Sequence, residues 1–222
     1  MFGIKDDSNA VDDGDFAAAR DRMVDRLGER GSVRRSPTER ALRNVPRHEF
    51  VPDAQQRNAY ADRPLPIGHE QTISAPHMVT VMTDLLELEQ GDRVLEIGTG
   101  CGYHAAVVAE IVGSGNVYSV EYLEEHATQA RERLERLGYD VCIKQGDGHR
   151  GWPEHAPYDA AYLTCATPEI PDAIIDQVRE GGVVVGPVGR GYQELVRLQI
   201  GSEGADRESH GGVRFVPMRG GE

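Results

Sequence analysis

Three glycines at alternate positions, Gly98, Gly100 and Gly102, follow a short apolar run and precede an apolar helical one. Glycine accepts positive φ freely, and without a side chain it lets a ligand lie against bare backbone. The order strand, glycine turn, helix is typical of turns that hold nucleotide-like cofactors. The pattern therefore predicts such a cofactor at this turn, although a glycine turn without a ligand remains the structural alternative.

The spacing of the glycines distinguishes between kinds of cofactor. The dinucleotide fingerprint G-x-G-x-x-G fails when it is started at Gly98, because Tyr103 occupies its last position. Started at Gly100 it is only partly matched, because Ala105 stands there. The E-x-G-x-G-x-G run from Glu96 to Gly102 instead matches the acidic-then-glycine pattern of S-adenosyl-L-methionine (AdoMet) methyltransferases. A carboxylate suits a ligand that carries an amino group and a positive sulfonium, whereas it would repel a pyrophosphate.

Acidic residues also follow the next two strands that the sequence predicts. Glu121 ends a strand at 116–120, about twenty residues past the glycines, where an acid can accept hydrogen bonds from both ribose hydroxyls. Asp147 stands between two glycines after a strand at 141–145. Such an aspartate is often only part of a turn. Its place at the carboxyl end of a neighbouring strand favours contact with adenine instead.

Ser74 precedes a helix that we expect to run from Pro76 to about Leu88. An isolated serine before Ala-Pro is typical of a helix N-cap, and the stretch alone supports nothing more. A catalytic role for this serine needs support from elsewhere in the chain.

Strands and helices alternate from Arg93 onward, which predicts a parallel sheet with right-handed crossovers. The expected core strands are 94–97, 116–120, 141–145, 158–163 and 183–186, and the expected helices between them are 105–112, 123–137 and 171–178. Strands at 193–200 and 213–217, separated by a polar loop at 201–212, predict antiparallel edge strands. The fold class is therefore α/β, a doubly wound, mostly parallel, Rossmann-like sheet.

The part of the chain before this core has its own pattern. Residues 1–14 predict a disordered acidic lead, and a helix at 15–30 follows. A second helix is expected with Ser36 as N-cap, proline in its first turn and a glutamate completing the cap. Prolines between 45 and 67 predict an extended segment that is too apolar for a free linker. Residues 15–90 are thus expected to pack on a core of residues 91–222 as one structural domain.

Composition narrows the class of protein. The net charge is −13, with only two lysines, which disfavours nucleic acid because phosphate binding needs a basic face. The same balance is typical of proteins from salt-loving archaea, and an ordinary acidic surface explains it equally well. No apolar run of eighteen residues or signal peptide is found, so we expect no membrane association and a cytoplasmic location. Three cysteines without C-x-x-C spacing argue against disulfides and a metal site.

The chain resembles a protein-L-isoaspartate (D-aspartate) O-methyltransferase from its first helix to Pro217. The stretches that carry the resemblance are VPRHEFVP at 45–52, AYADRPL at 59–65, QTISAPHM at 71–78, EIGTGCG at 96–102, GDG at 146–148, APYD at 156–159, PEIP at 168–171 and VRFVP at 213–217. The glycine motif is shared by many methyltransferases. QTISAPHM is far more specific.

This resemblance implies AdoMet as the cofactor and assigns roles to particular residues. Ser74 corresponds to the family's active-site serine with Thr72 beside it, and the backbone around Val216 and Pro217 would hold the substrate. The resemblance implies that Glu121 binds the ribose of AdoMet and that Asp147 and Gly148 lie at its adenine. The full set of residues implied to bind AdoMet is Glu96, Gly98, Thr99, Gly100, Gly102, Glu121, Tyr122, Asp147 and Gly148.

The implied reaction is methyl transfer to the α-carboxyl of L-isoaspartyl residues in age-damaged proteins and peptides, by an enzyme expected to be a monomer. The ester closes to a succinimide that reopens partly to normal aspartate, which is the repair. A carboxylate with a pKa near 4 is already ionised at neutral pH, so no general base is required. Alternatives are a methyltransferase for another carboxylate or small molecule on the same fold, or a silent AdoMet-binding adaptor.

Two departures from the family pattern concern the substrate side. Glu70 stands where many bacterial members have glycine, and Thr-Cys-Ala-Thr-Pro at 164–168 replaces Thr-Ala-Ala-Ala-Pro. If Glu70 borders an anionic acceptor, it would repel it, and salt would relieve the repulsion.

Overall fold

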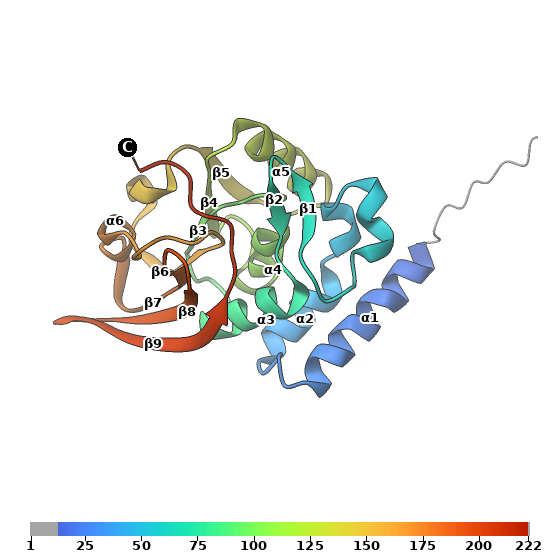
Figure 1. Cartoon of the computed structure of the whole chain (residues 1–222), viewed down its shortest axis with the longest axis horizontal. Coiled ribbons are helices and arrows are strands. Elements are labelled where there is room, and N and C mark those ends of the chain that lie inside the picture. The colour runs from blue at the N-terminus through green and yellow to red at the C-terminus, as the bar shows by residue number, and fades with distance from the viewer. Residues whose placement is uncertain (1–12, 222) are drawn as a thin grey trace, which may run out of the picture.

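The computed structural model of the chain describes residues 13–221, so most of the predicted acidic lead lies outside the described residues. Its centre is a seven-stranded sheet in the order β5-β4-β3-β6-β7-β8-β9, parallel from β5 to β7 and antiparallel beyond (Figure 1). The strands of this sheet are β3 (Val94–Ile97), β4 (Val117–Glu121), β5 (Val141–Gln145), β6 (Tyr158–Leu163), β7 (Val178–Val188), β8 (Gln193–Gly201) and β9 (Gly204–Val213). The predicted α/β fold with a mostly parallel sheet is confirmed.

Helices pack on both faces of the sheet because successive strand side chains alternate between the faces. On one face Val94, Ala160 and Val183 pack against α3 and α4. On the other face Leu95 and Ile97 pack in a cluster with the short α6. The helices are α1 (Asp13–Glu29), α2 (Ser36–Asn44), α3 (Pro76–Leu85), α4 (Tyr103–Val112), α5 (Glu124–Arg136) and α6 (Asp172–Ile175).

The chain order creates a crevice at the carboxyl end of β3. After β5 the chain returns to the other side of β3 as β6, so β4 and β6 flank β3 and the connections leave in opposite directions. Ligands of open α/β sheets bind at such a switch point. The glycine turn follows β3 directly and therefore lies at this crevice.

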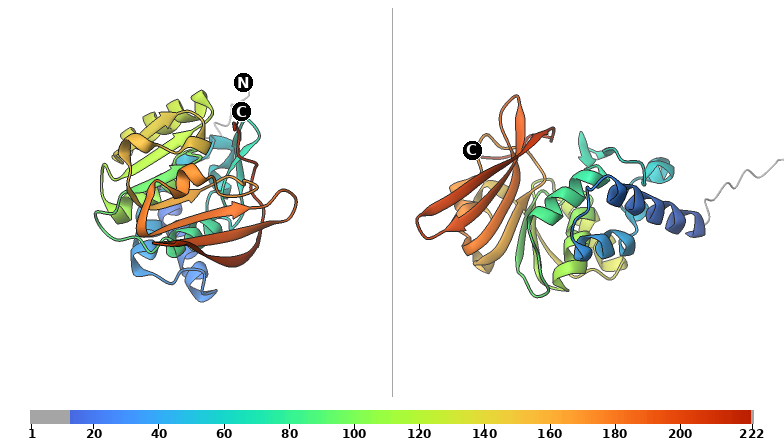
Figure 2. Two further views of the ribbon diagram at one scale, coloured as in Figure 1. Left: turned by 90° about the vertical axis from the view of Figure 1, so that its left-hand side faces the viewer. Right: turned by 90° about the horizontal axis from the view of Figure 1, so that it is seen from below.

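The N-terminal segment packs on α4 rather than forming a separate core. One buried cluster joins side chains of α1 and α2 with Tyr103, Val107 and Leu134 of the core. Two 3-10 helices, η1 (Arg47–Phe50) and η2 (Asp53–Asn58), lead into a hairpin of β1 (Leu65–Gly68) and β2 (Gln71–Ile73). In Figure 2 this segment, in blue and cyan, lies at the opposite side of the molecule from β7, β8 and β9.

Three predicted elements are wrong at the C-terminal edge. Most of the predicted loop at 201–212 is β9, which pairs antiparallel with β8. Of the predicted strand at 213–217, Val213 ends β9 and Pro217 makes an isolated bridge to Ala166. Residues 204–212 are exposed throughout, so this edge strand lacks the apolar alternation that marks a half-buried strand. The helix predicted at 171–178 stops at Ile175, because Val178 already begins β7.

The predicted capping box of α2 is also wrong. Ser36 lies inside the helix, Arg35 is the N-cap, and no side chain caps the helix. None of the helices within residues 13–221 has the length and apolar character needed to span a lipid bilayer.

Candidate active site

The glycine turn after β3 favours glycine at Gly98 and Gly100 because of its backbone conformation, and at Gly98 also because of a close contact. Gly98 has φ 97° and Gly100 has φ 53°, both in the region that favours glycine. A Cβ on Gly98 would overlap the hydroxyl oxygen of Thr164, which itself donates a hydrogen bond to the Gly98 carbonyl. Both glycines also line the pocket at the crevice.

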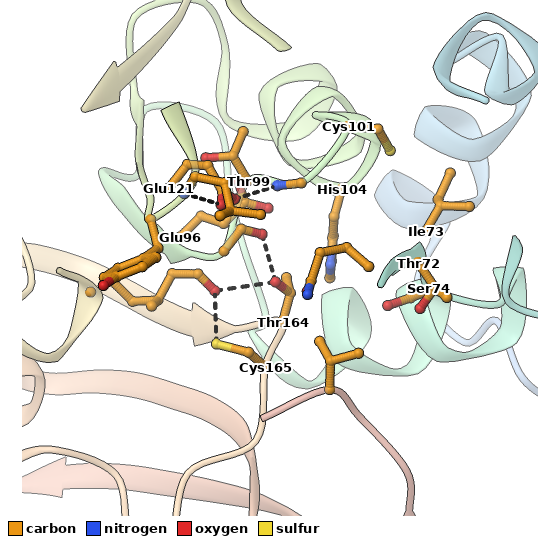
Figure 3. A pocket seen from close by; sticks show the side chains of 18 of the residues that line it. Thr72, Ile73, Ser74, Glu96, Thr99, Cys101, His104, Glu121, Thr164 and Cys165 are labelled. Atoms are coloured by element: carbon orange, nitrogen blue, oxygen red, sulfur yellow. Dashed lines mark hydrogen bonds between the residues drawn. The ribbon is translucent and has the colours of Figure 1, made fainter. Parts of the chain in front are cut away.

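A pocket of about 800 Å³, its open mouth included, lies at this crevice (Figure 3). The ends of strands β3, β4 and β6 form one wall, and the β1–β2 hairpin with Ser74 directly after it forms another. The predicted site residues that line it are Thr72, Ser74, Glu96, Gly98, Thr99, Gly100, Glu121, Tyr122, Gly148, Val216 and Pro217. Residues more than a hundred positions apart in the chain thus meet in one cavity.

Glu121 is buried at the end of β4 and ties the glycine turn to the start of α5. Its two carboxylate oxygens accept hydrogen bonds from the backbone N–H groups of Gly100, at 2.8 Å, and Leu123, at 2.9 Å. A carboxylate offers about four lone pairs, so each oxygen retains capacity for another donor. The side chain can therefore hold a ligand hydroxyl pair while it supports the turn.

Glu96 is fully buried on β3 and accepts two hydroxyl hydrogen bonds. Tyr162 donates to Oε1 at 2.8 Å, and Ser119, which also contacts the Thr99 hydroxyl, donates to Oε2. Burial raises the pKa of Glu96 from its ordinary 4.5 to about 8, although the two hydroxyl donors favour the ionised form. A cation bound beside Glu96 would lower this pKa and favour the ionised carboxylate.

The raised pKa of Glu96 predicts a pH dependence of folding stability. Between pH 4.5 and about 8 the folded chain keeps a proton that the unfolded chain has lost, so stability from this group is complete below pH 4.5 and is lost as the pH rises through 8. The free energy of unfolding of the wild type, minus that of Glu96→Gln, should fall by roughly 1.4 kcal/mol per pH unit in this window. Denaturant titrations at several pH values measure this difference, and a constant difference would contradict the assignment.

Ser74 is half-buried in the pocket wall, and it is not the N-cap of α3, the structural role that its sequence position suggested. Ala75 is the N-cap of α3, and no side chain caps that helix. The Ser74 hydroxyl hydrogen-bonds to none of the described residues, whereas its carbonyl accepts from Arg47 at 2.7 Å. Figure 3 shows Thr72 and Ser74 together, across the pocket from Glu96. The serine hydroxyl is therefore available to a ligand.

Two predicted cofactor residues do not line the pocket. Gly102 lies behind the turn, where a Cβ would meet Leu134 of α5 at 3.0 Å, so it serves helix packing. Asp147 accepts hydrogen bonds from the backbone N–H groups of His149 and Gly221 instead. Burial raises the pKa of Asp147, but these donors outweigh burial and lower it overall.

Glu70 also lies outside the lining of this pocket, and its place beside the acceptor stays a prediction. It is exposed at the tip of the β1–β2 hairpin with φ 61°, next to His69 with φ 50°. The tight turn directs the neighbouring Gln71, rather than Glu70, to the pocket.

Several lining residues were not predicted as site residues. His104 is buried, its Nε2 lies 3.0 Å from the Thr83 hydroxyl, and burial lowers its pKa to about 3, so the ring is neutral. Burial raises the pKa of the Cys165 thiol to about 12, so the thiol is protonated. Thr164 and Cys165 follow β6 at the same sheet edge, in the stretch 164–168 that the family resemblance relates to the substrate side without naming them as site residues. Met218 and Arg219 carry no such signal, because only the path of the C-terminal segment brings them here.

No group of three His, Cys, Asp or Glu side chains within residues 13–221 is arranged to hold a metal ion. The three cysteines are free, and Cys101 and Cys165 are buried.

Comparisons with known proteins agree on one family. The family model described as protein-L-isoaspartate(D-aspartate) O-methyltransferase matches residues 18–222. The chain is 51% identical over 209 residues to protein-L-isoaspartate O-methyltransferase 2 of Archaeoglobus fulgidus, covering 93% of this chain and 95% of the relative. It is 48% identical over 218 residues to the protein-L-isoaspartate O-methyltransferase of Methanopyrus kandleri, covering 96% of each.

Solved structures agree with the sequence relatives. A protein-L-isoaspartate O-methyltransferase superposes with a TM-score of 0.84 at 30% identity, covering 90% of this chain and 66% of that one. A second structure, a putative family member from Plasmodium falciparum in complex with S-adenosyl-L-homocysteine, has a TM-score of 0.79 at 22% identity, covering 90% and 98%, and shows the shared fold. With its fold, its pocket and these relatives in agreement, the chain belongs to the protein-L-isoaspartate (D-aspartate) O-methyltransferase family.

Proposed function

We propose that this protein transfers the methyl group of AdoMet to the α-carboxylate of L-isoaspartyl residues in damaged proteins and peptides. The methyl ester then starts repair through a succinimide. The observation that supports this most directly is the shared pocket, in which the glycine turn and two buried carboxyl groups face an unpaired serine hydroxyl (Figure 3). The protein is thus an AdoMet-dependent carboxyl methyltransferase.

The residues of the β3–β4 side fit AdoMet. Gly98 and Gly100 leave backbone exposed, Glu121 retains lone pairs for ribose hydroxyls, and Glu96 is suited to a nearby cation. Thr99, Tyr122 and Gly148 complete this side of the pocket. When bound, AdoMet supplies a methyl group on a positive sulfonium sulfur. Gly102 and Asp147 support the cradle from behind in this proposal, through Leu134 and the C-terminal segment.

The opposite wall fits the acceptor. The Ser74 hydroxyl can donate to one oxygen of the acceptor carboxylate, and Thr72 lies beside it. Val216 and Pro217 line the same pocket, and the Val216 carbonyl and the Met218 N–H are already bonded to Ala166, which holds this segment in place. We assign substrate backbone contact to this segment.

The chemistry requires positioning rather than a base. The acceptor carboxylate is ionised at neutral pH, so its oxygen can form the new O–C bond as the C–S bond breaks and the electron pair goes to sulfur. Holding the reacting groups in line within a closed site can lower the barrier by about 7 to 11 kcal/mol. Ser74 orients the oxygen, and the buried walls exclude water that would compete for the carboxylate.

Other features of the proposed function follow from the chain itself. One chain supplies the whole pocket wall, so we propose a monomer in which residues 15–90 and 91–222 act as one domain. The net charge of −13 argues against nucleic acid as substrate. Three free thiols favour the reducing cytoplasm.

Glu121→Ala should weaken AdoMet binding without unfolding the protein. Loss of hydrogen bonds to a charged acceptor costs about 1.5 to 3 kcal/mol, which corresponds to at least a tenfold rise in Kd. Titration calorimetry measures the change. Glu124→Ala is the matched control, because Glu124 is an exposed acid in the first turn of α5 that does not line the pocket. Equal AdoMet affinities in the two variants would remove Glu121 from the cofactor site.

The test of the proposed function is labelled methyl transfer from AdoMet to an isoaspartyl peptide and to its aspartyl twin. Transfer to the isoaspartyl peptide alone supports the proposal. Transfer to small carboxylates but not to the peptide would indicate a different methyltransferase, and AdoMet binding without any transfer would indicate an adaptor.

A further inference from the structure

Arg47, at the start of η1, is a charged side chain with no exposed surface. Its Nε donates to the Ala59 carbonyl and its Nη2 to the Ser74 carbonyl, both at 2.7 Å. Its guanidinium carbon lies 4.7 Å from the centroid of the Tyr103 ring. Arg47 therefore contacts two residues that line the pocket, Ser74 and Tyr103, from behind the wall.

This buried cation has no counter-ion in the part of the chain that the structure describes. None of the ion pairs within residues 13–221 involves Arg47, and its Nη1 has no hydrogen-bond partner. The other well-buried arginine, Arg197, pairs with Glu87 at 3.2 Å. Burial lowers the pKa of Arg47, because the low-dielectric interior disfavours its charge. A buried charge without a partner is costly, and an anion bound nearby would offset that cost.

The acceptor carboxylate is an anion that the proposed function places beside Ser74. The Arg47 guanidinium lies directly behind the pocket wall at Ser74, because it donates a hydrogen bond to the Ser74 carbonyl. We propose that Arg47 is a positioning residue for the methyl acceptor, holding the Ser74 peptide in place while its charge balances the carboxylate bound in front. This proposal rests on the proposed function and adds a source of carboxylate selectivity to it.

The test compares Arg47→Met, which keeps length but removes charge, with Arg47→Lys, which keeps charge but loses the paired geometry. Arg197→Lys and Arg197→Met are matched controls, because Arg197 is also buried and donates to a carbonyl, that of Leu85, but does not line the pocket. Active sites are counted by titration with S-adenosyl-L-homocysteine. The readouts are kcat and KM for an isoaspartyl peptide, the Kd of AdoMet, and Tm.

A further readout separates charge from structure. In the presence of S-adenosyl-L-homocysteine, the Kd of an isoaspartyl peptide is compared with that of the same peptide carrying an α-carboxamide. The wild type should prefer the carboxylate by about tenfold or more. Arg47→Lys should keep much of this preference, and Arg47→Met should lose it.

We expect kcat/KM per active site to fall by about tenfold in Arg47→Lys and about a hundredfold in Arg47→Met, with the AdoMet Kd little changed. The Arg197 variants should lower Tm only. If Arg47→Met does not fold, Arg47→Lys decides, and a kcat/KM within twofold of the wild type overturns the proposal. A carboxylate preference that survives in folded Arg47→Met overturns it as well. A wild type that fails to methylate the isoaspartyl peptide would contradict the proposed function instead.

Discussion

Replacing Ser74 with alanine should lower kcat for an isoaspartyl peptide by about a hundredfold while leaving AdoMet affinity within about twofold. The hydroxyl has no partner among the described residues and faces the pocket, so its loss removes a donor to the acceptor carboxylate alone. Because Ser74 does not cap α3, the change should alter the free energy of unfolding by less than about 0.5 kcal/mol.

Three measurements on one preparation check this result: turnover with saturating AdoMet, AdoMet affinity by calorimetry, and denaturant unfolding. Ser74→Thr keeps a hydroxyl and should recover part of the lost turnover. If Ser74→Ala keeps full turnover with the peptide, the serine hydroxyl does not position the acceptor.

Gly98→Ala should abolish measurable AdoMet binding and destabilise the fold by about 2 to 5 kcal/mol. Two effects add at this position. The φ of 97° strains any residue with a side chain, and the new Cβ would overlap the Thr164 hydroxyl, which cannot rotate away without losing its hydrogen bond to the Gly98 carbonyl. The turn would then move off the end of β3 and close the cradle.

Gly91→Ala is the matched control for strain. Gly91 has nearly the same φ, 94°, but a Cβ there meets nothing within 4 Å, and Gly91 does not line the pocket. It should lose about 1 to 2 kcal/mol and keep its AdoMet affinity. Thermal unfolding and calorimetry on both variants test the comparison. Equal losses of stability and unchanged affinity in both would mean that the Thr164 contact has no part in the cofactor site.

Local patterns in the sequence predicted most of the sheet and the turn. The short apolar runs at β3 and β6 are nearly continuous, as expected of strands buried on both faces of a sheet. The glycines after β3 stand where the backbone has positive φ. Because carboxyl ends of parallel strands share one edge, Glu121 could be placed beside the glycine turn from its position at the end of β4. The QTISAPHM stretch, by its resemblance to a family, predicted Ser74 as a site residue, and Ser74 lines the pocket; its contact with the acceptor stays a prediction.

Contacts between distant segments decided the rest. Gly102 and Gly98 carry the same signal in the sequence, yet Leu134 packs on one and Thr164 faces the other, so only Gly98 lines the pocket. β9 has no buried face and hence no alternation to read. Arg47 belongs to a recognisable stretch, but its burial behind Ser74 depends on how η1 and β2 pack together. The periodicity of a segment predicts which of its faces is buried. It does not predict which residue packs against that face, because that residue comes from a distant part of the chain.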